Sequence, residues 1–125
     1  KTFGCRRWAI SGILGLTGEY DGIIAFRLHK VLAIKMLERS GLVFKDEGQR
    51  EELESGMIAE VTNVISGNAI SKIGEYALDI APPVVIYGEN HTISWPRGYP
   101  IVGIPFSSNA GPFEIDVCFK EHDYS

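Results

Sequence analysis

The sequence predicts an α+β fold in which helices pack on a mainly antiparallel β-sheet. Apolar runs come in consecutive pairs near both ends of the chain, and two segments with helical periodicity lie between them. Strands that follow one another and are joined by turns favour antiparallel pairing. With 125 residues, 45% of them hydrophobic and 22% charged, the chain has enough apolar residues to form one core. We therefore expect a single domain over residues 1–125.

The first pair of strands is predicted on either side of a turn. Residues 5–17 are rich in Trp, Ile and Leu, GEYDG (18–22) is typical of a turn, and IIAFRL (23–28) alternates with period two. Two such runs around a turn predict an antiparallel hairpin. Gly12 and Gly15 inside the first run indicate a bulge or a bend.

Two helices are predicted next. HKVLAIKMLERSG (29–41) changes to helical periodicity, and Gly41 is a stop signal. A longer helix is expected to begin near Glu47, because Asp46 followed by Gln49 resembles a capping box.

The last third of the chain predicts strands. Two prolines in APPVVIYG (81–88) must end the helix, and residues 84–87 form a short β-favouring run. Residues 99–121 predict a second hairpin, with Pro105 at a sheet edge or a bulge. In its final strand the apolar Phe113, Ile115, Val117 and Phe119 alternate with Glu114, Asp116, Cys118 and Lys120. This alternation predicts a half-buried strand with one solvated face.

The long helix carries two different faces. At about 100° per residue, an apolar stripe predicted to face the core spans roughly 120°; it consists of Met57, Ile58, Val61, Val64 and Ile65. Glu60, Asn63 and Gly67 fall in an opposite arc of about 60°. Polar residues are ordinary on an exposed helix face, but Gly67 destabilises the helix and leaves its backbone open to another surface. Asn68 would enter the apolar stripe of a straight helix, so either the helix bends near residues 67–68 or its later half is buried on a different side.

Charge and composition exclude several classes of function. The net charge is −4 with no basic cluster, so nucleic acids and anionic membrane surfaces are not expected partners. No apolar run reaches the ~20 residues of a membrane span. Cys5 and Cys118 lie near opposite ends, which favours two reduced intracellular thiols. His29, His91 and His122 are scattered, so no metal site is predicted.

The long helix resembles the signature helix of the CheX/CheC/FliY phosphatases of bacterial chemotaxis. That pattern is Glu-x-x-Asn-x-x-x-Gly followed by a small residue, and AEVTNVISGNAISKI (59–73) matches it from Glu60 to Ala69. DIAPPVVIYGEN (79–90) is similar to the segment that follows in CheX relatives. TGEYDGIIAFRL and GPFEIDVCF resemble the family's first hairpin and closing strand. CheC-type proteins typically carry two copies of the motif, so the one copy here indicates a CheX-like chain.

The resemblance implies a CheC-like fold and a phosphatase that acts on the aspartyl phosphate of a CheY-type response regulator. Asn63 would orient the attacking water and Glu60 would contact the regulator's lysine, as the two catalytic residues. Gly67 and Asn68 would contact the partner. Mg²⁺ would be supplied by the regulator, so no cofactor is expected on this chain.

The resemblance further implies a cytoplasmic homodimer that joins through sheet edges, beside Pro105 or Cys5. The abrupt start of the chain indicates that the family's N-terminal helix is missing.

Two other functions remain open at this point. The same fold could be a non-catalytic module that recruits a receiver domain or a signalling scaffold through the same helix face. A small-ligand sensor would need a pocket between sheet and helices with convergent polar groups, and no such groups are identified in the sequence.

Overall fold

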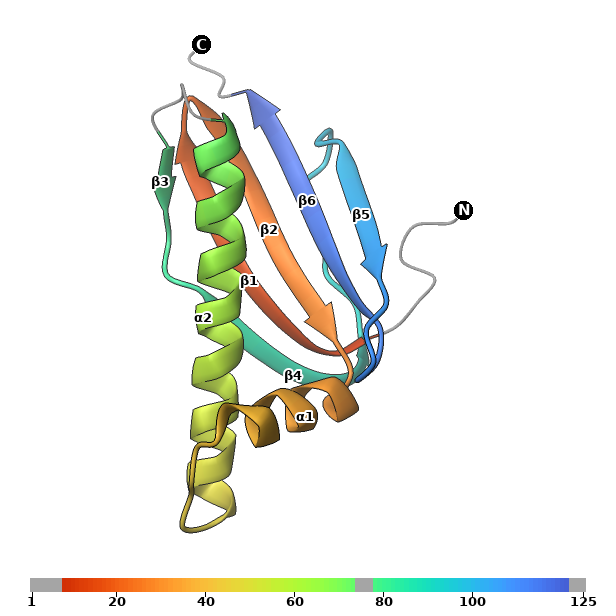
Figure 1. Cartoon of the computed structure of the whole chain (residues 1–125). Helices are drawn as coiled ribbons and strands as arrows, with labels where there is room; N and C mark the ends of the chain where they lie inside the picture. Colours follow the sequence, from red (N-terminus) through yellow and green to blue (C-terminus); the bar gives the residue numbers. More distant parts are fainter. Residues whose placement is uncertain (1–7, 74–77, 122–125) are drawn as a thin grey trace.

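The computed structural model, which describes residues 8–73 and 78–121, has the predicted α+β architecture (Figure 1). The elements are β1 (Trp8–Gly18), β2 (Tyr20–Leu28), α1 (Lys30–Ser40), α2 (Glu47–Ile73), β3 (Leu78–Ile80), β4 (Val84–His91), β5 (Ile101–Phe106) and β6 (Phe113–Glu121). Within these described ranges, six strands form one sheet in the order β3-β1-β2-β6-β5, and β4 also pairs with β1. All the pairings are antiparallel.

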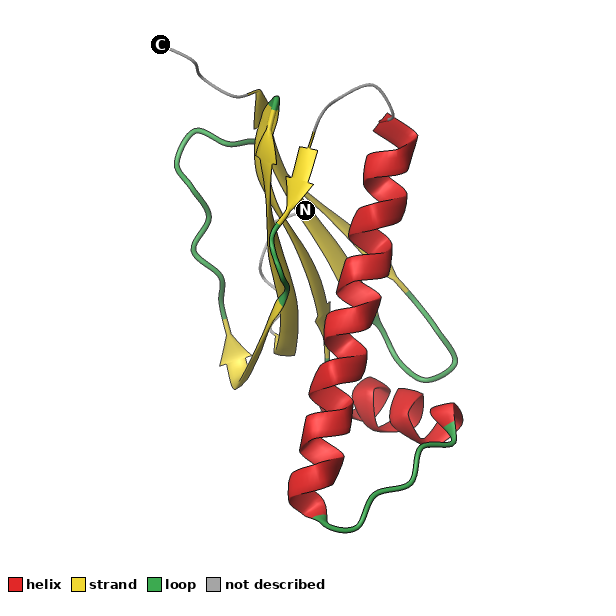
Figure 2. Ribbon diagram, turned by 90° about the vertical axis from the view of Figure 1, so that its left-hand side faces the viewer, coloured by secondary structure: helices red, strands yellow, loops and turns green. Residues whose placement is uncertain are grey.

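The molecule has α2 on one face of the sheet and a chain connection on the other. α2 runs along the sheet, α1 lies at one end, and the connection from β4 to β5 passes over the reverse face (Figures 1 and 2). Apolar residues between α1, α2 and the sheet form the core, which includes Ile10, Phe26, Leu28, Leu32 and Ile58. A second cluster of Leu14, Leu16 and Ile24 continues it along the sheet. None of the described helices is long and apolar enough to cross a membrane.

The first hairpin is confirmed, with a shorter turn than predicted. β2 begins at Tyr20, so Gly22 lies within the strand opposite Leu16 rather than in a turn over residues 18–22. Gly18 has a φ of 133°, a conformation that glycine adopts most readily. The tight turn therefore rests on one glycine at the end of β1.

Both predicted helix boundaries are confirmed. α1 ends at Gly41, which is left-handed (φ 76°) and donates its N–H to the Glu38 carbonyl. At the start of α2, the Gln49 N–H donates to the Asp46 carboxylate over 2.9 Å, and the Gln49 side-chain oxygen accepts from the Lys45 N–H over 2.6 Å. This is close to the expected capping box.

The second hairpin and its edge position are also confirmed. β5 pairs with β6, Pro105 lies opposite Glu114, and β5 is the last strand of the sheet order. The run predicted over residues 84–87 extends to His91 as β4. The three-residue β3 was not predicted, because so short a strand has no readable alternation.

The prediction of a solvated face on β6 is wrong. Glu114, Asp116 and Cys118 are 4%, 0% and 0% exposed, and they point to the reverse face of the sheet. The register places Glu114 beside Arg27 of β2, and Arg27 beside Ser11 of β1. The sheet therefore has polar residues buried on the side away from α2.

These side chains form a reverse-face cluster, defined here as Ser11, Arg27, His91, Glu114 and Asp116. The Arg27 guanidinium donates to Ser11 Oγ (3.2 Å) and to the His91 carbonyl (3.1 Å), and lies 3.5 Å from the Asp116 carboxylate. Ser11 Oγ is 2.7 Å from Nε2 of His91. Burial, followed by the hydrogen bond and charge of Glu114, raises the pKa of Asp116 to about 7, although Arg27 opposes the shift. The cluster joins β1, β2 and β6 to the end of β4.

Candidate functional site

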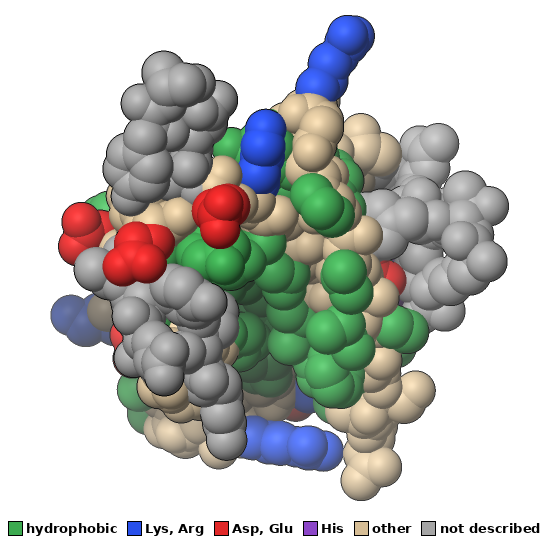
Figure 3. All heavy atoms as spheres, turned by 90° about the horizontal axis from the view of Figure 1, so that it is seen from above, with side chains coloured by type: hydrophobic (Ala, Val, Ile, Leu, Met, Phe, Trp, Pro, Cys, Tyr) green, Lys and Arg blue, Asp and Glu red, His purple; other side chains and the backbone are tan. Residues whose placement is uncertain are grey.

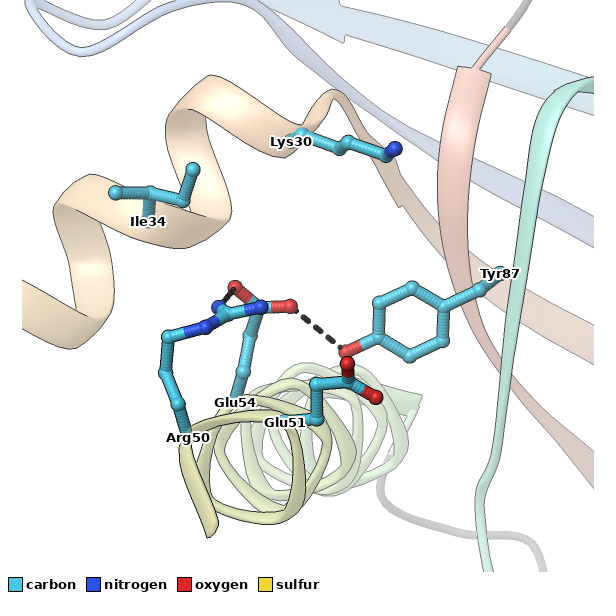
Figure 4. Close-up of a pocket in the computed structure, with 6 residues that line it drawn as sticks. All are labelled: Lys30, Ile34, Arg50, Glu51, Glu54 and Tyr87. Atoms are coloured by element: carbon cyan, nitrogen blue, oxygen red, sulfur yellow. Dashed lines mark hydrogen bonds and ion pairs between the residues drawn. The ribbon is translucent and has the colours of Figure 1, made fainter. Parts of the chain in front are cut away.

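The candidate site lies on α2, whose first turns are fixed by charged contacts. Arg50 forms ion pairs with Glu47 (2.7 Å) and Glu54 (2.9 Å), the i,i+3 and i,i+4 neighbours. The other oxygen of the buried Glu54 accepts from the Tyr87 hydroxyl over 2.9 Å. Figure 4 shows this contact joining α2 to β4 across a pocket of about 260 Å³. Burial, followed by the hydrogen bond to Glu54, raises the pKa of Tyr87.

The face of α2 that touches the sheet differs from the predicted apolar stripe. Ile58 is buried as expected, but Val64 is 51% exposed, so its assignment to the core is wrong. Thr62 and Ser66, both 0% exposed, lie on the sheet side instead. Their hydroxyls donate to the carbonyls of Ile58 and Thr62, each over 2.8 Å, which satisfies both groups without water.

Gly12 explains why small hydroxyl residues face the sheet. A Cβ at Gly12 would overlap Thr62 Oγ1 and crowd Ile58. Gly12 itself pairs regularly with Phe26 and Val85, and the irregularity of β1 lies between Trp8 and Ile10. Of the bulge or bend expected at Gly12 and Gly15, no bulge is present at either position, and Gly12 instead lets α2 approach the strand closely.

The outer face of α2 carries the motif residues. Glu60 and Gly67 are exposed and Asn63 is half-buried, while the buried Thr62 and Ser66 fix the opposite side to the sheet. Glu60 and Asn63 are i,i+3 neighbours separated by about 4.5 Å of helix rise. Within the described part of the chain, neither side chain forms a hydrogen bond or an ion pair, so both are available to bind another molecule.

Gly67 and Asn68 are also exposed, and α2 does not break between them. The helix is continuous from Glu47 to Ile73 and follows a straight path in both ribbon views. A Cβ at Gly67 would meet no atom within 4 Å. Asn68 does not enter the core of this straight helix, because the sheet side runs along the row of Thr62 and Ser66.

An apolar groove lies beside α2 on the same face of the sheet. It encloses about 450 Å³ between α1, α2 and the second hairpin, and Phe26, Val61, Ile65, Phe106 and Phe113 are among its lining residues. Figure 3, a view of the upper end of the molecule, shows hydrophobic side chains gathered at the centre of that end as well. Arg39 and Ser108 are the polar side chains that line the groove, so it lacks the several convergent polar groups of a typical small-ligand site.

Among the described residues, no three His, Cys, Asp or Glu side chains come together as possible metal ligands. Besides the exposed Asn68, the outer face of α2 offers one adjacent carboxylate and carboxamide, those of Glu60 and Asn63. Such a pair can orient water and bind a cation on another molecule.

The sequence and the fold were compared with known proteins. The model of the family described as chemotaxis phosphatase CheX matches residues 10–107. The chain belongs to the CheX family. No curated protein matches the sequence significantly.

Solved structures of CheX proteins share the fold over most of the chain. CheX from Desulfovibrio desulfuricans is 32% identical with a TM-score of 0.79, and the match covers 96% of this chain and 80% of that one. CheX from Vibrio vulnificus is 31% identical with a TM-score of 0.77, covering 92% and 78%. The CheX chain of a CheX–CheY–BeF3–Mg²⁺ complex from Borrelia burgdorferi is 27% identical with a TM-score of 0.79, covering 97% and 79%. The last relative was solved bound to CheY.

Proposed function

We propose that this CheX-family chain hydrolyses the aspartyl phosphate of a CheY-type response regulator, with Asn63 and Glu60 as its catalytic residues. The observation that carries the proposal is the adjacent, unpaired placement of Glu60 and Asn63 on the accessible side of α2. A family model for chemotaxis phosphatases and a relative solved with CheY support the same partner.

Asn63 is proposed to orient the attacking water. The water oxygen attacks phosphorus, the bond from phosphorus to the aspartyl oxygen breaks, and both water protons remain on the inorganic phosphate. An acyl phosphate is already activated, so correct positioning supplies much of the catalysis. A carboxamide accepts from water and adds no negative charge beside the phosphoryl group, whereas a carboxylate would be repelled.

Glu60 is proposed to bind the lysine of the receiver's active site. A carboxylate and an ammonium form a charge-assisted hydrogen bond that fixes the docking angle of α2. Gly67 and Asn68 extend the same face, and the bare backbone at Gly67 leaves room for the receiver's loops. Mg²⁺ would be held by the receiver, where it neutralises phosphoryl charge.

The protein is further proposed to act in the cytoplasm as a homodimer joined at a sheet edge. β5, the last strand of the described sheet order, pairs only with β6 and offers such an edge beside Pro105. Cys5, which marks the other expected edge, lies outside the described residues. Light scattering on the purified protein tests the dimer.

The first test is phosphate release from a purified CheY protein phosphorylated by acetyl phosphate. Asn63→Ala should lower kcat at least about tenfold, because no side chain then orients the attacking water. Asn63→Asp keeps the shape but adds charge and should be equally impaired. Glu60→Gln should raise KM, while Glu52→Gln, a change at another exposed glutamate of α2, should match the wild type.

Unchanged hydrolysis by Asn63→Ala would contradict the catalytic role. A non-catalytic receiver-binding module is the second candidate, because the same exposed face suits docking alone. It would bind CheY tightly while phosphate release stayed at the rate of CheY by itself.

A further inference from the structure

The outer face of α2 is poor in charge although the rest of the helix is not. The first turns of α2, residues 47–54, include Glu47, Arg50 and three more glutamates. From Ser55 to Ser71, Glu60 is the single charged residue. An exposed helix face normally gains solubility from charged side chains, and depletion of charge is typical of the centre of a protein interface.

Val64 is the apolar residue at the centre of this face. It is 51% exposed, and it lies one turn after Glu60, next to Asn63 and one turn before Gly67 and Asn68. A lone exposed valine is ordinary on a protein surface. Here it stands beside the two proposed catalytic side chains, and the glycines at positions 56 and 67 leave open space on either side of it along the helix.

The charge of this face fits an aspartyl-phosphate site. Such a site is anionic, so each additional carboxylate on the approaching helix would oppose docking. The chain carries 16 acidic residues and a net charge of −4, yet places only Glu60 between residues 55 and 71. A neutral apolar contact adds binding free energy at this position without repelling the phosphoryl group.

We propose that Val64 is an apolar docking residue that packs against the receiver domain beside Glu60 and Asn63. This inference rests on the proposed function, since it assigns a further contact to the same partner. Val64 makes no contact with the reacting atoms, so it contributes to partner affinity and leaves the hydrolytic step to Asn63.

The test compares Val64 with Val31, an equally helical valine on α1 that is 59% exposed. The probe is a CheY protein carrying beryllium fluoride and Mg²⁺ in place of the phosphoryl group. Val64→Ala should raise Kd about tenfold, because a buried isopropyl group is lost, and Val64→Asp should raise it further. The controls are Val31→Ala and Val31→Asp, which make the same changes in size and charge on α1, away from the outer face of α2. They should keep Kd within about twofold of the wild-type value.

Turnover on phosphorylated CheY separates docking from chemistry. The Val64 variants should raise KM and keep kcat within about twofold, unlike Asn63→Ala. Equal Kd values for the Val64 and Val31 variants would overturn the inference, as would a loss of kcat without a change in KM. If Asn63→Ala still lowers kcat at least about tenfold in that case, the proposed phosphatase activity stands and only the role of Val64 is refuted.

Discussion

The outer face of α2 and the reverse face of the sheet have opposite distributions of charge. The outer face is open to solvent but holds one charged side chain, Glu60, between residues 55 and 71. The reverse face is closed, and yet Arg27, Glu114 and Asp116 are at most 4% exposed there. Charge is thus concentrated where strands must be held in register, and it is sparse where we propose that a partner docks.

The difference shows that charged side chains are not simply placed where solvent is: the buried ones bind one another, and the exposed ones are left available to a partner. Arg27 contacts Ser11, the His91 carbonyl and one carboxylate oxygen of Asp116, so these buried groups belong to one network. Glu60 and Asn63 have no such partners within the described chain and keep their hydrogen-bonding capacity for another molecule. A variant in each region should therefore affect a different property.

Arg27→Ala should give the largest loss of stability. It leaves the buried Asp116 without the cation that it pairs with, and breaking a buried ion pair typically costs about 3–5 kcal/mol. Urea unfolding at pH 7 measures this loss. Glu60→Ala, which removes an exposed charge, should change the free energy of unfolding by less than about 0.5 kcal/mol. If the two variants lost similar free energies of unfolding, the proposed difference between the reverse face and the outer face of α2 would be wrong.

Asp116→Asn should change how stability depends on pH. The pKa of Asp116 is raised to about 7 in the folded chain, above the ordinary value of 3.8, so the folded state binds the proton more tightly than the unfolded state does. Its contribution is therefore complete below pH 4 and is lost as the pH rises to about 7, on the order of a few kcal/mol. Unfolding at several pH values should show this decline in the wild type and a flatter profile in Asp116→Asn.

Glu47→Gln provides a control of opposite sign. The hydrogen bond from Arg50 lowers the pKa of Glu47, so its contribution is present at neutral pH and is lost as the pH falls. Glu47→Gln should leave the decline between pH 4 and 7 in place. If Asp116→Asn left it in place too, another group would be responsible.

The sequence predicts most of the framework because its signals are local. The capping box at Asp46, the stop at Gly41 and the hairpins depend on residues close in the chain. The adjacency of Glu60 and Asn63 follows from the helical repeat alone. Their proposed roles came from the family resemblance, which helical geometry could not supply.

The errors concern packing between distant segments. Alternation along β6 separates two faces but does not reveal that the connection from β4 to β5 passes over one of them. Val64 was assigned to the core because it is apolar, while Thr62 and Ser66 reach the sheet by bonding to their own helix. Gly12 was the available signal, since a strand glycine can mark the close approach of another element.

Gly67→Ala should have a small effect on stability, with the opposite sign to that of Arg27→Ala. A Cβ at this position meets no other atom within 4 Å. Alanine also has a much higher helix propensity than glycine, so the free energy of unfolding should rise by about 0.5–1 kcal/mol. The same methyl group would occupy the bare backbone that we propose faces the receiver, so Kd for beryllium fluoride-charged CheY should increase. Gly48→Ala in the first turn of α2 should stabilise the helix without changing Kd, because this residue lies away from the outer face. An unchanged Kd in Gly67→Ala would show that the receiver does not reach this end of the helix, and would confine the docking face to Glu60, Asn63 and Val64.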